Sequence, residues 1–266
     1  MKRISLVFAI AGLTILFAFG QKKEIRSVSG FTGIDASSVF EITVTKGSVE
    51  SLVVEADDDV MQYVRSEVRN GVLHLYLDKN NRLKNIKTLK ASVVMKNFDS
   101  ASLSGACKLV ANDLFTPDKF KGECSGASHL TVHINTGQLN IRGSGASKIQ
   151  AKANVTGDAT MNFSGASNVK LDLKAENVKF NSSGSCSADV SGSAKNFNID
   201  ASGSSNINAG DFTVETVSVK SSGSGKISVH ATNDLNINSS GASTVKYKGA
   251  PAINVNSSGS SKVRKM

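Results

Sequence analysis

Apolar and polar residues alternate along most of the chain, and this alternation is organised around a short Ser-Gly motif. The motif, Ser-Gly followed by Ala or Ser, recurs every 18–21 residues, with its glycine at Gly105, Gly126, Gly145, Gly165, Gly184, Gly203, Gly223, Gly241 and Gly259. We number each copy from this glycine as position 0. A regular repeat of this length indicates a solenoid, in which stacked copies share one core.

The positions around each glycine separate cleanly into apolar and polar sets. Position +4 is apolar in all nine copies: Leu109, Leu130, Ile149, Val169, Ala188, Ile207, Ile227, Val245 and Val263. Positions −4 and −6 are mostly apolar, whereas no apolar residue occurs at −5, −3 or +3. Strict alternation is the period of a strand with one buried face. Each copy therefore predicts two short strands, at about −7 to −2 and +2 to +7, on either side of a Ser-Gly corner.

The corner and the remaining residues suggest how one coil closes. Glycine suits a corner that needs a positive φ or a close backbone approach. The small residues at +2, mostly Ser, could donate a hydrogen bond to a neighbouring carbonyl. The variable remainder forms a loose third side that contains Pro117 and Pro251. We predict a narrow, roughly triangular, single-stranded right-handed parallel β-helix of about 19 residues per coil. A left-handed hexapeptide helix is the alternative, but its aliphatic spacing differs from the spacing of two seen here.

Residues 21–104 precede the regular repeats of residues 105–266 and are less periodic. Asn70-Gly71, between apolar segments at residues 64–68 and 73–77, predicts a β-hairpin. Residues 57–59 are three aspartates that could cap one helical turn, and residues 79–90 form a basic loop. We expect a lead-in of first coils whose hairpin or helix covers the open end. A separate small domain is the alternative.

The first twenty residues predict a signal peptide. Lys2 and Arg3 precede an apolar run over residues 4–19, and Ala18 and Gly20 stand at −3 and −1 of a cleavage site before Gln21. An uncleaved anchor is the alternative, although the run is short for a membrane span. No later segment is apolar enough to cross a membrane. We therefore expect a periplasmic, cell-surface or secreted protein.

With these features the chain resembles the putative auto-transporter adhesin, head GIN domain family of bacterial envelopes. The matching features are the signal peptide, the Ser-Gly-Ala-Ser repeats, the Asn70-Gly71 hairpin, the opening at residues 28–34 and the segment at residues 247–251. The resemblance covers about residues 25–264. It implies a right-handed parallel β-helix, an extracytoplasmic location and an adhesin-like role, and it assigns no catalytic or ligand-binding residues.

Candidate chemistry lies on the outward positions +3, +5 and +7, which carry many cations. They form a basic stripe: Lys108, Lys148, Lys152, Lys170, Lys226, Lys246, Lys248, Lys262 and Arg264. Without Lys2 and Arg3 the chain has 29 basic and 22 acidic residues, a net charge of +7. Such a stripe could attract acidic glycans or other envelope polysaccharides. A solvated face that keeps the strands soluble is the alternative. Nucleic acid is not expected, because no exposed aromatic platform accompanies the cations.

The sequence predicts a noncatalytic binding protein without a cofactor or a metal. Cys107, Cys124 and Cys186 should point inward, and only a Cys107–Cys124 disulfide is geometrically open. His129 and His133 lack further ligands for a metal. Residues 122–126 imitate a nucleophile elbow but lack its strand–turn–helix setting. A carbohydrate-active enzyme, such as a polysaccharide lyase or hydrolase, is the alternative, and it would need clustered carboxylates.

Overall fold

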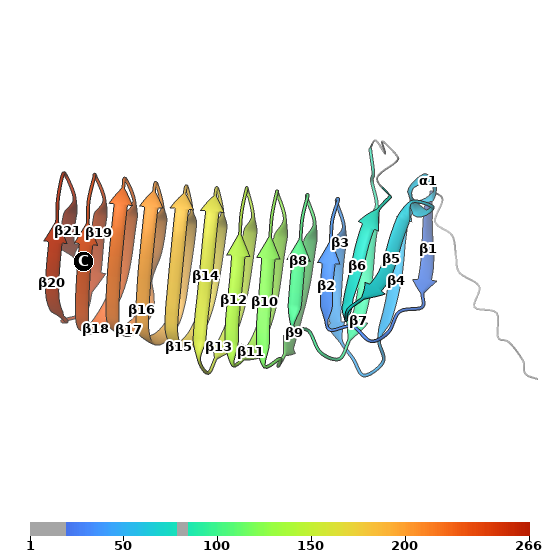
Figure 1. Cartoon of the computed structure of the whole chain (residues 1–266), viewed down its shortest axis with the longest axis horizontal. Helices are drawn as coiled ribbons and strands as arrows, with labels where there is room; N and C mark the ends of the chain where they lie inside the picture. Colours follow the sequence, from blue (N-terminus) through green and yellow to red (C-terminus); the bar gives the residue numbers. More distant parts are fainter. Residues whose placement is uncertain (1–19, 79–84) are drawn as a thin grey trace, which may run out of the picture.

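The computed structural model describes residues 20–78 and 85–266, which form one elongated right-handed parallel β-helix (Figure 1). The predicted signal peptide, apart from Gly20, lies outside these residues, as do residues 79–84 of the predicted basic loop. The one helix of the described chain is α1 (Asp58–Met61). No described helix has the length and apolar character that a membrane span requires.

Each regular coil has one strand before its Ser-Gly turn and one strand after it. The separate strands before the turns are β8 (Ser100–Leu103), β10 (Lys119–Cys124), β12 (Gln138–Gly143), β14 (Asp158–Gly165) and β20 (Ala252–Ser257). Those after the turns are β9 (Lys108–Phe115), β11 (His129–Thr136), β13 (Lys148–Val155), β19 (Thr244–Lys248) and β21 (Lys262–Lys265). Successive coils pair in parallel, so that Leu130, Ile149 and Val169 form one interior column. The predicted alternation is therefore confirmed.

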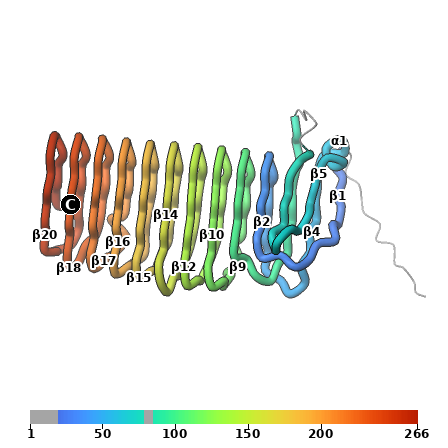
Figure 2. The backbone as a smooth tube through the Cα atoms, in the orientation of Figure 1, coloured from blue at the N-terminus to red at the C-terminus, as the bar shows by residue number. Residues whose placement is uncertain are grey.

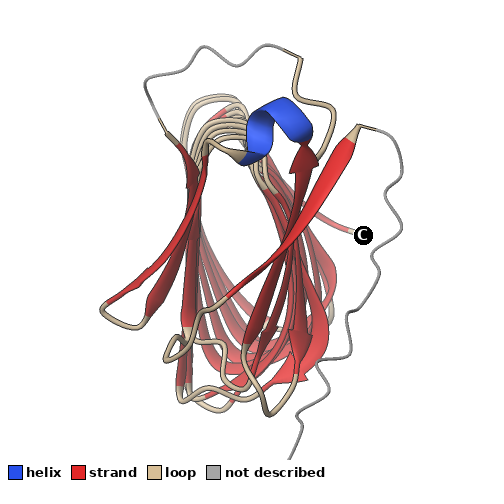
Figure 3. Cartoon of the chain, turned by 90° about the vertical axis from the view of Figure 1, so that its right-hand side faces the viewer, coloured by secondary structure: helices blue, strands red, loops and turns tan. Residues whose placement is uncertain are grey.

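In four coils a single strand continues from one Ser-Gly turn to the next. These are β15 (Asn168–Gly184), β16 (Ser187–Gly203), β17 (Asn206–Gly223) and β18 (Lys226–Ser239). The prediction of a loose third side is wrong for these coils, because strand pairing continues through it, as at Ala175 opposite Ala194. Phe212 and Val214 are buried there. Two strand walls thus diverge from narrow Ser-Gly turns and meet again at a curved base (Figure 3).

The core is a thin column of aliphatic side chains with pairs of aromatic rings. Phe98 contacts both Phe115 and Phe120 edge-on, with ring centroids 5.4 Å apart in each pair. Phe197 and Phe212 form another T-shaped pair at 5.2 Å, and Phe212 comes from the curved base. Edge-to-face packing at this distance adds to the stabilisation from buried area. These pairs tie the base of the coil to its walls. Both prolines lie outside the strands, as predicted.

The Ser-Gly turns stack backbone on backbone. All nine motif glycines have a positive φ, between 68° and 105°. The residue after each glycine donates its N–H to the carbonyl of position 0 in the preceding coil, at 2.7–2.9 Å in all nine copies. A Cβ on any of these glycines would stand 2.4–2.8 Å from that same carbonyl oxygen. Both the conformation and the contact therefore require glycine, which confirms the predicted role of the corner.

The residue at +2 closes the turn from inside the core. Ser128 donates its hydroxyl to the Ser125 carbonyl at 2.8 Å, and Ser167 donates to the Ser164 carbonyl at 3.1 Å. Ser147 and Ser167, on adjacent coils, also share a hydrogen bond of 3.1 Å. Buried hydroxyls need such partners. The predicted hydrogen bond from position +2 to a nearby carbonyl is thus present.

One further coil precedes the nine motif copies. Strands β2 (Gly33–Ala36) and β3 (Glu41–Lys46) pair in parallel with β8 and β9 and lie beside them, although a long segment separates them in sequence (Figure 2). Ser38 occupies position 0 of this coil with φ 88°, and its carbonyl accepts the N–H of Ala106 at 2.7 Å. The motif search misses this coil because serine stands where the other coils have glycine.

Antiparallel strands close the N-terminal end. On one wall β6 (Val72–Leu77) pairs in parallel with β2 and forms the predicted hairpin with β5 (Val64–Arg69). On the other wall β7 (Leu89–Met95) pairs with β3, β4 (Ser51–Asp57) with β7, and β1 (Gln21–Arg26) with β4. Helix α1 covers the end near the turns (Figure 3). The lead-in is therefore one coil followed by a mixed cap.

The helical turn forms where the aspartates predict it, but its cap differs. The Asp57 side chain makes no cap hydrogen bond to α1. Its carboxylate instead accepts the backbone N–H groups of Lys87 at 2.7 Å and Thr88 at 3.2 Å. Asp57 thus fixes the segment that leads into β7, which sequence spacing could not indicate.

We expect Gly165→Ala to lower the free energy of unfolding by about 1–3 kcal/mol, because a Cβ is strained at positive φ and would stand 2.7 Å from the Gly145 oxygen. Gly210→Ala is the control, since Gly210 has no positive φ and its nearest atoms lie at 3.6–3.7 Å. Urea unfolding followed by circular dichroism measures both. Equal losses in the two variants would contradict the stacking requirement.

Candidate functional site

All nine stripe residues lie exposed on the strands that follow the turns, which we call the basic wall. Strand register places equivalent positions next to each other along the axis. Lys108, His129 and Lys148 are direct neighbours at +3, and Lys246 and Arg264 are neighbours at +5. Neighbouring strands are about 4.8 Å apart. The residues that sequence alternation assigned to one face therefore share that face.

The structure divides these cations into two groups with a neutral to acidic interval between them. The near group comprises Lys108, Lys148, Lys152 and Lys170, and the far group comprises Lys226, Lys246, Lys248, Lys262 and Arg264. Asp189 and Asn208 lie in the interval, where Asn208 donates to the Asp189 carboxylate at 3.1 Å, whereas Asp172 lies beside Lys152 within the near group. The positive potential is thus concentrated at two places on the rod.

The two groups differ in shape and in pairing. A hollow of about 360 Å³ lies over the near group, lined in part by Lys152, Lys170, His133 and Gln150. In the far group Lys248 pairs with Asp211 at 3.2 Å. Within the described chain it is the only one of the nine stripe residues that forms an ion pair. Eight of these cations therefore present their charge to solvent.

The pKa of His129 is affected by two lysines of the near group. Partial burial, followed by the charges of Lys148 and Lys108, lowers the pKa of His129 from its usual value. A neighbouring cation disfavours the imidazolium form, so this histidine stays neutral at pH 7. No cluster of three metal-ligating side chains occurs in the part of the chain that the structure describes.

The three cysteines are buried and free, so the Cys107–Cys124 disulfide that the sequence left open is not formed. Desolvation raises the pKa of Cys107 to about 11 and the pKa of Cys124 and of Cys186 to about 12. A thiol that remains protonated at neutral pH is a poor nucleophile. Cys124 also ends a strand before a stacked turn, not a strand–turn–helix elbow.

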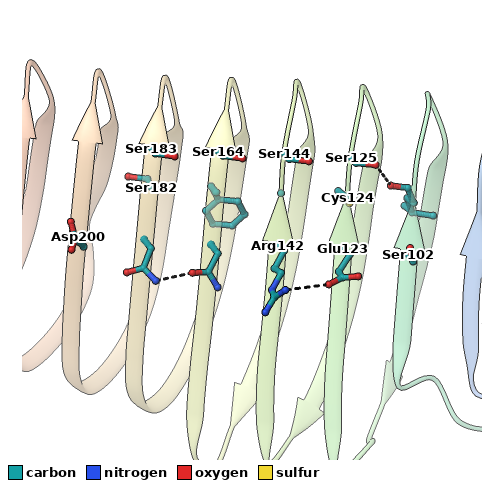
Figure 4. Close-up of a pocket in the computed structure, with 15 residues that line it drawn as sticks. Ser102, Glu123, Cys124, Ser125, Arg142, Ser144, Ser164, Ser182, Ser183 and Asp200 are labelled. Carbon is teal, nitrogen blue, oxygen red and sulfur yellow. Dashed lines mark hydrogen bonds and ion pairs between the residues drawn. The ribbon is translucent and has the colours of Figure 1, made fainter.

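The opposite wall, formed by the strands before the turns and called the amide wall, contains a groove of about 660 Å³ near those turns (Figure 4). Its residues come from positions −3, −2 and −1 of successive coils: Ser102, Leu103, Glu123, Cys124, Ser125, Arg142, Gly143, Ser144, Asn162, Phe163, Ser164, Asn181, Ser182, Ser183 and Asp200. Every position −1 that lines the groove is a serine. Sequence analysis did not indicate this depression, because it combines outward residues at −3 with positions −2 and −1 beside the turn.

Charges at the groove are compensated locally. Glu123 pairs with Lys121 at 3.0 Å and lies 3.8 Å from Arg142, and Asp200 lies 4.0 Å from Lys220. Between them the amide of Asn181 donates to the Asn162 oxygen at 2.7 Å (Figure 4). The groove is therefore polar but nearly neutral, in contrast to the basic wall.

A family model for the putative auto-transporter adhesin, head GIN domain matches residues 30–157 and 152–251. The chain belongs to this family. For a head GIN domain protein, an adhesin-like role and an extracellular or surface location are the general expectation. No curated protein matches the chain.

Solved structures share the fold of this head GIN domain chain. A putative adhesin from Parabacteroides distasonis has 22% identity and a TM-score of 0.69, covering 92% of this chain and 97% of that chain. A putative lipid binding protein from the same species has 19% identity and a TM-score of 0.71, with coverages of 93% and 97%. A putative adhesin from Parabacteroides merdae has 17% identity and a TM-score of 0.67, also with 93% and 97%. At these identities the likeness shows the fold alone.

We expect Lys148→Gln to raise the pKa of His129, because the substitution removes a positive charge that opposes protonation. Lys246→Gln, on a distant coil of the same wall, should leave that pKa unchanged. Titration of the imidazole signals by NMR measures both variants. An unchanged pKa in Lys148→Gln would contradict the inference that the charge of Lys148 acts on His129.

Proposed function

We propose that this chain is a noncatalytic, extracytoplasmic adhesin-like protein whose basic wall contacts anionic glycans of the cell envelope. The observation that carries this proposal is the far group, in which five cations lie on three neighbouring strands. Among the described residues only one of the five, Lys248, forms an ion pair. The remaining four form no ion pair with a carboxylate in the part of the chain that the structure describes. An extended polyanion could follow this array along the axis.

A rigid scaffold favours such contacts. The strands β18, β19 and β21 are paired in register, so the cations keep a fixed spacing of about 4.8 Å along the axis. Charges that are already arranged need no ordering of the backbone on binding. The near group with its hollow offers a second contact on the same wall.

The arrangement of carboxylates supports binding without catalysis. Glycoside hydrolases use two carboxyl groups roughly 5–10 Å apart. On the basic wall Asp172 and Asp189 are diagonal neighbours on adjacent strands, about 7–8 Å apart. On the amide wall Glu123 and Asp200 are separated by four strand steps, about 19 Å. Of these two pairs only Asp172 and Asp189 fall within that range, and the Asp189 carboxylate already accepts a hydrogen bond from the Asn208 amide.

The location follows from the predicted signal peptide together with family membership. One structural neighbour is described as a putative lipid binding protein. Anionic lipid head groups carry charges of the same sign as acidic glycans. The experiment therefore includes both a polysaccharide and a vesicle arm.

The test measures binding of residues 21–266 to polygalacturonate, with neutral dextran as the reference and phosphatidylglycerol vesicles as the lipid arm. The variant Lys226→Glu, Lys246→Glu, Lys262→Glu should weaken polygalacturonate binding at least about tenfold, since three surface ion pairs at roughly 0.5 kcal/mol each amount to this. Binding by the unmodified protein should also fall as salt rises.

The matched control carries Lys90→Glu, Lys96→Glu and Lys174→Glu, which changes the net charge equally at exposed lysines outside the stripe. We expect this control to retain binding within about twofold. If both variants lost polygalacturonate binding equally, net charge alone would explain the loss, and the proposal would be contradicted. Binding to vesicles but not to polygalacturonate would replace glycans with lipid head groups as the partner.

A further inference from the structure

The groove on the amide wall is a second site, and its chemistry differs from that of the basic wall. We propose that it binds a linear, uncharged glycan that lies along the solenoid axis, across the strands. This inference does not depend on the proposed function, because the groove and the far group lie on opposite walls of the coil.

The first support is the charge balance of the groove. Its carboxylates, Glu123 and Asp200, each have a basic neighbour within 4.0 Å, and Arg142 shares Glu123 with Lys121. A charged polymer would meet almost no net potential here. Hydroxyl groups both donate and accept hydrogen bonds, so a polyol matches a surface where donors and acceptors are mixed.

The second support is a set of polar groups that the protein leaves available. Asn181 donates to Asn162, but within the described chain the Asn162 NH₂ group and the Asn181 carbonyl oxygen have no protein partner. The hydroxyls of Ser144, Ser164 and Ser183 likewise donate to no protein acceptor among those residues. At −3 the groove is thus edged by the two amides together with three charged side chains and Ser102. Hydroxyls at −1 edge it on the side of the turns (Figure 4).

The third support is periodicity. Positions −3 and −1 recur once per strand, about every 4.8 Å along the axis, and the register through β10, β12, β14, β15 and β16 has no break in the groove. That step is comparable to one pyranose unit in an extended chain. The volume of about 660 Å³ lies in the range of small-ligand sites.

An extended peptide fits this groove less well. Peptides that bind to sheets usually add as a strand to an exposed edge. Every strand under the groove already has a paired neighbour on both sides, from β8 through β17. No backbone edge is therefore free, and recognition must use side chains alone.

The test screens residues 21–266 against neutral linear oligosaccharides, namely cello-, laminari-, manno- and malto-oligomers, by NMR shift mapping and calorimetry. We expect at least one of them to bind and to perturb the side-chain amide signals of Asn162 and Asn181. The double variant Asn162→Ala, Asn181→Ala should weaken this binding at least about tenfold, because two hydrogen-bonding side chains are removed.

The matched control is Asn238→Ala, Asn256→Ala. These two residues occupy the same position −3 on neighbouring coils of the same wall and are register partners, but they do not line the groove. Binding within about twofold of the unmodified protein is expected for this control. Unfolding midpoints of both double variants show whether the coil is intact.

Three outcomes would overturn the proposal: no binding by any neutral oligomer, equal loss in both double variants, or shifts confined to the basic wall. The Lys226→Glu, Lys246→Glu, Lys262→Glu variant separates the two proposals. It should lose polygalacturonate binding and keep neutral-oligomer binding if both are right. Loss of neutral-oligomer binding in that variant would show that the groove is not the site.

Discussion

The structure depends on backbone stacking at the Ser-Gly turns. Each turn donates one N–H to the carbonyl of the turn before it and approaches that carbonyl too closely for a side chain to intervene. In a parallel sheet a slip of one residue would turn every interior side chain outward. The stacked glycines oppose such a slip, because a neighbouring residue shifted into the turn would bring its Cβ against the carbonyl oxygen of the preceding turn. Register then fixes which side chains align along both walls.

The strands around the turns could be predicted because their interior positions obey one strict rule. Leu130, Ile149 and Val169 follow that rule, and they fall in one buried column. The curved base could not be predicted, because its inward residues, such as Phe212, follow local irregularities in register. The sequence predicts first coils before the repeats but cannot place the turn of this coil, because Ser38 adopts the left-handed turn conformation without the glycine that marks the other turns.

For the candidate sites as well, the sequence predicts which residues face outward but does not predict the shape of the surface. Which residues face outward follows from alternation, so the nine basic residues were identified from sequence and are all exposed. Their separation into two groups follows from the intervening strands β16 and β17, which carry Asp189 and Asn208 on this face. The groove combines residues at three positions per coil, and one of these positions, −2, belongs to the core. Alternation alone cannot indicate that an inward position also lines a surface depression.

Because each coil contacts only its two neighbours, the length of the solenoid can change without altering its cross-section. Duplicating a complete coil within the segment from Gly145 to Gly184 would lengthen the groove by one strand and would keep the turn stacking on either side. Tandem duplication of a short DNA segment is thus sufficient to extend the contact surface in equal increments. Proteins with this fold could therefore differ in the number of coils, and so in the length of the contact surface, while they keep the same Ser-Gly turn.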